Sequence, residues 1–260
     1  MKKIFGLILF IVVHTFSFAQ TIESKAEPVF KAGEMLKYRL RYGFITAAEA
    51  TLKVEDTDLK LNNRPVYNLV AQGRTSGTFD IFYKVRNRYD SFIDKETLLP
   101  HLYTENIHES NYRRKDKARF YQDQKKVIAN KGTFKGNTEQ IFDVVSAYYF
   151  SRNLDMSDIK AGTSIKMHYF LDDEVSSLEI TYIGKEKVKT SMGYFNCLKF
   201  SPSIQPGRIF KKDSKLYLWI TDDGNRIPVK AQVDILVGSV TMELTSADNL
   251  KYPLTISKKD

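Results

Sequence analysis

The segment NTEQIFDVVSAYYFSRN, residues 137–153, is the stretch whose apolar residues repeat with a helical period. Positions i, i+3, i+4 and i+7 of one helix face are filled by Ile141, Val144, Val145 and Tyr148. Asn137 followed by Gln140 has the form of a helix N-cap with a residue able to reach back to it. Valine and tyrosine lose rotamer freedom in a helix, so this helix needs packing to hold it. The segment therefore predicts a central helix over 137–153 that the rest of the chain covers.

Elsewhere the chain alternates apolar and polar residues with the period of two that is typical of half-buried β-strands. In GEMLKYRLRYG, which starts at Gly33, the apolar set is Leu36, Tyr38, Leu40 and Tyr42, and the polar set is Lys37, Arg39 and Arg41. The connections are short and show no βαβ rhythm, which indicates antiparallel strands. We therefore expect a mainly β, β-rich α+β fold, in which a curved antiparallel sheet or half-barrel wraps around the central helix.

The 260 residues are enough for one β-rich domain, which we place at 32–250. Two halves, 32–132 and 161–245, lie on either side of the helix and share some features. SFIDKETLLPHLYTE in the first half corresponds to LWITDDGNRIPVKAQ in the second. Either an ancient duplication or the sequence pattern that β-hairpins generally share explains this likeness. Residues 20–31 are expected to form a loose leader, and residues 251–260 a tail.

The N-terminal segment has the three parts of a secretory signal. Lys2 and Lys3 precede an apolar run at 4–13, and Ser17 and Ala19 supply the small residues that signal peptidase reads. Cleavage is expected after Ala19. No cysteine follows the apolar run, so we expect no lipid anchor on such a residue. These features predict export to the periplasm of a Gram-negative bacterium, or association with its outer membrane.

No catalytic constellation is visible in the sequence. Cys197 is the single cysteine and is flanked by apolar residues, which favours a buried, inert thiol. His101 and His108 would face opposite sides of a strand, whereas a zinc site needs three or four converging ligands. The net charge of +9 is spread along the strands among acidic residues, and an exported protein is not expected to bind nucleic acid. We therefore expect no catalytic residue, no metal and no cofactor, although an envelope hydrolase remains an alternative.

Two sets of residues are candidates for binding. The first set would line a concavity of the sheet and comprises Tyr38, Leu40, Tyr42, Leu69, Tyr89, Tyr148 and Tyr149. These residues combine apolar bodies with polar tips, but each of them also suits an ordinary core. The second set is the basic cluster Arg113, Arg114, Lys115, Lys117 and Arg119. It would contact anionic lipid head groups, or it would be a solvated strand edge that repels unwanted pairing.

Several short motifs occur in an order that resembles a known family. They are Gly33-Glu34-x-Leu36-x-Tyr38, then Phe142-Asp143-Val144-Val145-Ser146-Ala147-Tyr148-Tyr149 with Arg152, then Gly184-x-Glu186-x-Val188 with Gly193-x-Phe195 and Pro202, and last Leu218-Trp219-Ile220-Thr221-Asp222-Asp223 with Arg226-x-Pro228-Val229 and Gly238. Over residues 32–245 the chain resembles domain-of-unknown-function family 3108 of exported bacterial proteins. It departs from the family at Ala47-Ala48-Glu49, where a glycine is expected before the glutamate.

The family resemblance implies export and a β-rich fold, and it carries no established activity. The chain is also similar, more distantly, to the periplasmic half-barrel carriers of lipoproteins. We therefore expect a non-enzymatic envelope protein that binds a lipid, an acylated molecule or a glycan in a concavity of its sheet. The alternatives are an envelope hydrolase and a structural partner of another envelope protein in an outer-membrane assembly.

Overall fold

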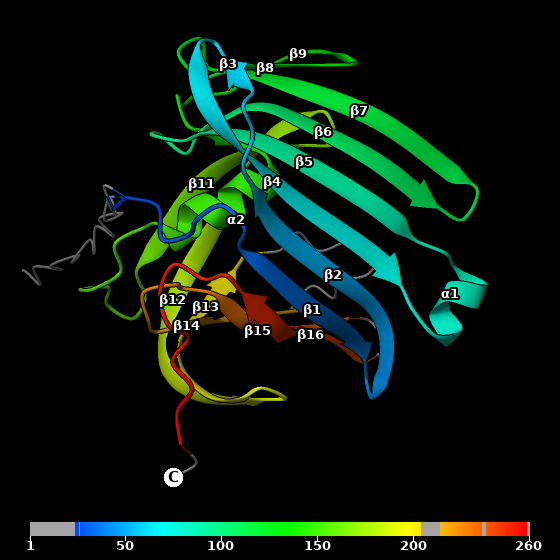
Figure 1. Cartoon of the computed structure of the whole chain (residues 1–260), viewed down its shortest axis with the longest axis vertical. Coiled ribbons are helices and arrows are strands. Elements are labelled where there is room, and N and C mark those ends of the chain that lie inside the picture. Colours follow the sequence, from blue (N-terminus) through cyan, green and yellow to red (C-terminus); the bar gives the residue numbers. More distant parts are fainter. Residues whose placement is uncertain (1–23, 26, 204–213, 236–237, 259–260) are drawn as a thin grey trace, which may run out of the picture.

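The computed structural model describes residues 24, 25, 27–203, 214–235 and 238–258, so the predicted signal segment lies outside the described residues. In this part of the chain fifteen strands pair side by side in one curved sheet, and a sixteenth, β3 (Lys60–Leu61), pairs only with β4 (Arg64–Thr75). The sheet does not close, because β10 and β9 form its two ends. Figure 1 shows it curling around helix α2 (Val144–Arg152). The predicted β-rich fold with an antiparallel sheet around a central helix is confirmed.

The two halves of the chain form the two arms of the sheet. The first arm consists of β1 (Met35–Tyr42), β2 (Ile45–Glu55), β4 (Arg64–Thr75), β5 (Arg86–Asp94), β6 (Pro100–Glu109), β7 (Tyr112–Tyr121), β8 (Lys126–Ala129) and β9 (Gly132–Lys135). The second arm consists of β10 (Ile141–Phe142), β11 (Ser164–Leu171), β12 (Glu174–Thr190), β13 (Gly193–Pro202), β14 (Leu216–Thr221), β15 (Pro228–Asp234) and β16 (Ser239–Asp248). A short helix, α1 (Thr78–Phe82), connects β4 to β5. The arms meet where β1 pairs antiparallel with β16.

Helix α2 begins at Val144, so the predicted start at 137 with Asn137 as N-cap is wrong. Asp143 is the N-cap: its carboxylate accepts hydrogen bonds from the backbone N–H groups of Val145 and Ser146, both at 2.9 Å. The Ser146 hydroxyl accepts in return from the Asp143 backbone N–H at 3.0 Å, which completes a capping box. The two residues before Asp143 form strand β10, which pairs parallel with β11. Residues 141 and 142, which the periodicity assigned to the helix, therefore form a strand instead.

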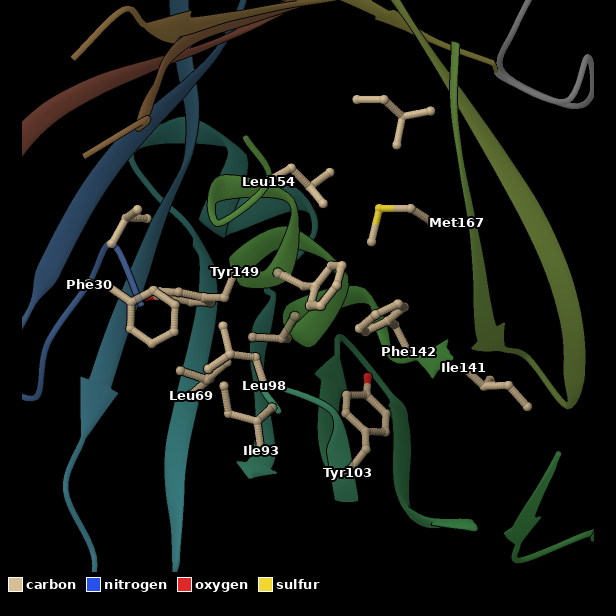
Figure 2. Close-up of a cluster of buried hydrophobic side chains, with 14 of the residues drawn as sticks. Phe30, Leu69, Ile93, Leu98, Tyr103, Ile141, Phe142, Tyr149, Leu154 and Met167 are labelled. Atoms are coloured by element: carbon tan, nitrogen blue, oxygen red, sulfur yellow. The ribbon is translucent and has the colours of Figure 1, made fainter. Parts of the chain in front are cut away.

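The later start also changes the buried face of the helix. Its buried residues are Val145, Ser146, Tyr149, Phe150 and Arg152, whereas Val144 is 40% exposed. Figure 2 shows α2 packed between Leu69 and Ile93 of the first arm and Met167 of the second. One end of the space inside the sheet is thus filled by a continuous apolar core.

The described part of the leader is packed, contrary to our expectation of a loose segment. Phe30 is 2% exposed, and its ring meets that of Tyr149 edge-on with 4.9 Å between centroids. The backbone N–H of Val29 donates to the Asn153 side-chain oxygen at 3.0 Å. The expected tail is also held, because the Asn225 side chain donates to the Tyr252 carbonyl at 2.9 Å.

Candidate functional site

A buried ion pair joins the start of the sheet to the end of α2. Arg152 donates to both carboxylate oxygens of Glu34, at 2.6 and 2.9 Å, and its Nε donates to the Asn225 carbonyl at 3.1 Å. The two side chains are 1% and 0% exposed. Burial acts to lower the pKa of Arg152, but Tyr148 and Glu34 outweigh it and hold that pKa above its usual value. The pair is enclosed and its donors are engaged, so it links the end of the helix to the start of the sheet.

From the sequence, Arg152 was named only as part of a family motif and was assigned no partner. Its partner was nevertheless visible, because Glu34 and Arg152 carry opposite charges in two of the motifs that define the family resemblance. A charged residue in a motif beside apolar residues is a signal for a buried partner, since a buried charge must be paired. Glu34 was not recognised as the partner of Arg152 because the two residues are far apart in the sequence.

The inner face of the sheet, which is the face toward α2, changes from buried to accessible along its strands. On β1, Leu36 and Tyr38 are buried near the helix, and Leu40 is partly exposed farther along. The other arm follows the same course, since Leu244 of β16 is buried and Met242 is partly exposed. Further apolar side chains on the accessible part of the inner face are Tyr42, Ala48, Tyr89, Ile107, Val233 and Val240. We call this part the open inner face.

The structure divides the seven residues that we proposed for a concavity. Tyr38, Leu69 and Tyr149 are 2%, 0% and 0% exposed and belong to the core. Tyr148 is partly buried beside them, and its hydroxyl lies 3.3 Å from that of Tyr38. Burial raises the pKa of both phenols, so they stay neutral at ordinary pH.

The remaining three residues of that set lie on the open inner face. They are Leu40, Tyr42 and Tyr89. The hydroxyl of Tyr89 accepts a hydrogen bond from the Asn87 side chain at 3.3 Å. Burial also raises the pKa of Tyr89, which keeps its hydroxyl a neutral hydrogen-bonding group beside apolar surface.

The opposite, outer face of the sheet carries a polar hollow of about 490 Å³ over β1, β2, β4, β5 and β6. Its basic side chains are Lys37, Arg39, Arg74, Arg86 and Arg88. Three of these arginines have carboxylate partners: Arg74–Glu49 at 2.7 Å, Arg86–Asp80 at 2.6 Å and Arg88–Asp90 at 2.6 Å. The hollow is therefore a polar surface with a positive excess.

The basic cluster does not form one patch, because β7 alternates its side chains between the two faces. Arg113, Lys115, Lys117 and Arg119 are exposed on the outer face. Arg114 points inward, where its Nε lies 2.7 Å from Glu105 and 2.6 Å from Asp116. Its Nη1 also reaches Asp172 of the second arm at 3.3 Å. Arg114 is thus a contact between the two arms, and only the other four residues face solvent.

The described residues hold no group of three or more His, Cys, Asp or Glu side chains placed to bind a metal ion. Cys197 is buried, and burial raises the pKa of its thiol to about 12, as expected of an inert cysteine. His101 lies 3.3 Å from Asp94, and that carboxylate already contacts Arg64 and two backbone N–H groups. Within the same part of the chain, no helix has the length and apolar character needed to cross a bilayer.

Comparison with known families now identifies the class of protein. The profile of a family described as protein of unknown function (DUF3108) matches residues 37–245. The chain therefore belongs to this family, as its motifs indicated. No curated protein matched the chain.

Two solved structures are similar to this fold. One is a β-barrel-like protein of domain of unknown function DUF1849 from Brucella abortus, with 12% identity, a TM-score of 0.56, and coverage of 87% of this chain and 100% of the other. The second is a putative exported protein with a YmcC-like fold from Bacteroides fragilis, with 10% identity, a TM-score of 0.34, and coverage of 86% and 99%. The first likeness supports a barrel-like fold and says nothing about activity.

Proposed function

We propose that this is an exported, non-enzymatic envelope protein that binds an acyl chain or a similar lipid ligand on the open inner face of its sheet. The observation that carries the proposal is the change in exposure along the strands. Apolar residues of both arms are buried beside α2 and accessible beyond it. If the inner face served only to form the core, it would be buried along the whole length of the strands.

The lining of the open inner face suits an acyl chain that has one polar end. Leu40 and Met242 are register partners across the β1–β16 seam and supply apolar surface. Burial of each CH₂ group of a ligand against such surface contributes about 0.8 kcal/mol. Tyr42 and Tyr89 add hydroxyl groups that suit a polar head group. Export is supported by the charged and apolar pattern of residues 1–19.

The proposal is tested with the processed protein after delipidation, by titration with a fluorescent fatty acid. Leu40→Gln should weaken binding about tenfold, or ~1.4 kcal/mol, because it places an amide on the apolar lining. Arg41→Gln is the matched control, since Arg41 is the next residue and faces the other side of the sheet. Its affinity should equal that of the unchanged protein.

Three results would overturn the proposal. The first is that no lipid co-purifies and no fatty acid binds up to its solubility limit. The second is turnover of an ester or glycosidic substrate by the purified protein, which would make it an envelope hydrolase. Equal weakening by both substitutions would place any binding outside the open inner face.

A glycan is the second candidate ligand, and the outer polar hollow favours it. Lys37 and Arg39 line the hollow beside Thr51 and Gln72, so cationic and neutral hydrogen-bonding groups face the same space. Acidic oligosaccharides fit these donors better than acyl chains do. Titration with a uronic-acid oligosaccharide tests this, and Arg39→Ala should abolish the binding that Arg41→Ala leaves intact.

A further inference from the structure

Three neighbouring connections expose large apolar side chains at the end of the first arm away from α2. The largest exposed fractions are those of Phe44 at 93%, Ile81 at 82% and Phe82 at 81%. Tyr112, Tyr83 and Ile45 follow at 54%, 50% and 43%. They lie in or beside the β1–β2 turn, the α1 connection and the β6–β7 turn, and we call these six residues the apolar tips. Figure 1 shows the three connections at the margin of the sheet opposite α2.

Backbone hydrogen bonds place the three connections side by side. The N–H of Ser76, just before α1, donates to the Ala47 carbonyl of β2 at 3.1 Å. The N–H of Ser110, in the β6–β7 turn, donates to the Lys84 carbonyl just after α1 at 2.7 Å. The Tyr83 hydroxyl also donates to Glu109 at 3.3 Å. The apolar tips therefore form one edge of the molecule and are not isolated residues in separate loops.

Neither strand pairing nor the core requires these side chains. Helix α1 buries none of its residues, so Ile81 and Phe82 contribute nothing to the core by burial. A polar residue in place of Phe44 would form the β1–β2 turn equally well. Adjacent exposed apolar residues on a soluble domain mark a surface that meets a partner or a membrane.

The charges of this edge select the kind of partner. Segments 41–46, 76–86 and 109–113 contain four basic residues and two acidic ones. Both acidic side chains are engaged, Asp80 by Arg86 at 2.6 Å and Glu109 by Asn87 at 2.7 Å. A positive edge with projecting Phe and Ile side chains matches an anionic bilayer, where apolar groups enter the head-group region and cations meet lipid phosphates. The same positive charge disfavours a second copy of this edge.

We propose that the apolar tips dock the protein onto an anionic membrane surface, with Phe44, Ile81 and Phe82 inserted at head-group depth. This docking is independent of the ligand proposed for the open inner face, because it uses a different set of side chains. It is a reversible, peripheral contact, because a few side chains bury far less apolar surface than a spanning segment.

The test is co-sedimentation of the processed protein with vesicles of phosphatidylcholine alone and of phosphatidylcholine mixed with phosphatidylglycerol. Binding is expected to the mixed vesicles and to decrease with salt. The triple variant Phe44→Ser, Ile81→Ser, Phe82→Ser should lose at least about tenfold in partition, or ~1.4 kcal/mol. The matched control is Leu171→Ser with Ile183→Ser, which removes apolar residues that are 40% and 44% exposed elsewhere. It should bind as the unchanged protein does.

A second measurement reports insertion directly. The chain has one tryptophan, Trp219, which is 5% exposed, so its emission is insensitive to vesicles. Phe44→Trp should add an exposed fluorophore whose emission shifts to the blue only with anionic vesicles. Failure of the unchanged protein to bind, or equal binding by the triple variant, would overturn membrane docking. So would a triple variant that converts a dimer into a monomer in light scattering, which would assign the edge to a second copy.

Discussion

The two ends of the inner face have similar residues and opposite surroundings. Beside α2, Leu69 and Ile93 are fully buried, and Arg152 of this helix pairs with the buried Glu34. Beyond the helix, Leu40 of β1 and Met242 of β16 remain partly exposed, although Leu36 and Leu244 on the same two strands are buried. Strand alternation alone therefore does not decide what a face does. The apolar core is concentrated where the helix covers the sheet, and accessible apolar surface is left where it does not.

The largest effect should come from a charge placed at the covered end. Val145→Asp puts a carboxylate at a side chain that is 4% exposed, and we expect a loss of several kcal/mol in the free energy of unfolding, about 4. Val144→Asp is the matched control, because Val144 is 40% exposed in the first helical turn, where an anion is tolerated. Lys37→Asp on the outer face should change stability by less than about 0.5 kcal/mol. Urea denaturation measures all three, and equal midpoints would show that the helix does not dock as described.

Breaking the buried ion pair should have nearly as large an effect. Glu34→Gln leaves the Arg152 guanidinium buried without its counter-charge, which should cost about 3–5 kcal/mol. The double variant Glu34→Leu, Arg152→Met should lose less than the sum of the single substitutions, because it removes both charges together. Additive losses in a double-mutant cycle would mean that the two side chains do not interact.

Substitution of one leucine at each end of the inner face compares the two regions directly. Leu69→Ala should cost about 2–5 kcal/mol, because it leaves a cavity in the core beside α2. Leu40→Ala should cost less than about 1.5 kcal/mol, since that side chain is only partly buried. Thermal unfolding of the two variants measures the difference. Similar losses would contradict the open inner face.

A further effect depends on pH and lies at the rim of the covered end. Burial acts to raise the pKa of Asp94, but Arg64 and the backbone N–H groups of Thr97 and Glu96 outweigh it and hold that pKa below its usual value. Its stabilising contribution is therefore fully present above about pH 4 and is lost as the pH falls through the lower pKa of the folded state. Asp94→Asn should lower the free energy of unfolding by about 2 kcal/mol at pH 7. This difference from the unchanged protein should become smaller below about pH 4.

Glu96→Gln is the control for this effect. Glu96 contacts the same Arg64 at 2.7 Å but is 83% exposed, so its loss should cost less than about 1 kcal/mol. Urea denaturation of both variants from pH 3 to 7 separates them. A gap for Asp94→Asn that does not narrow in acid would show that the carboxylate charge is not what stabilises this rim.

The sequence predicted the architecture better than the details, and for physical reasons. Alternation along β1 identified the inner and outer residues correctly, because period two is intrinsic to a strand. The helix start was missed because residues 141 and 142 pair with β11, a contact made across the fold. The seven ligand candidates could not be divided by sequence, since Leu40 and Leu69 differ only in whether α2 covers them.

The apolar tips were not recognised from sequence for a related reason. Residues 43–46 have the composition of a turn, and Phe44 within them does not reveal whether the fold buries it. Only the placement of three connections on one edge shows that Phe44, Ile81 and Phe82 belong together. Exposure is a property of the assembled sheet and is not encoded in any one segment.

The seam between β1 and β16 has a consequence for how the molecule comes into being. Met35 pairs with Asp248, so β1 and β16, which are the first and last described strands in chain order, lie side by side in the sheet. Each arm is otherwise made of neighbours in sequence, which meet early and locally. When the chain folds, one edge of β1 pairs with the neighbouring β2, and its other edge stays unpaired until β16 reaches it. Such a contact of high sequence separation forms slowly, so the joining of the two arms is expected to be a late step of folding.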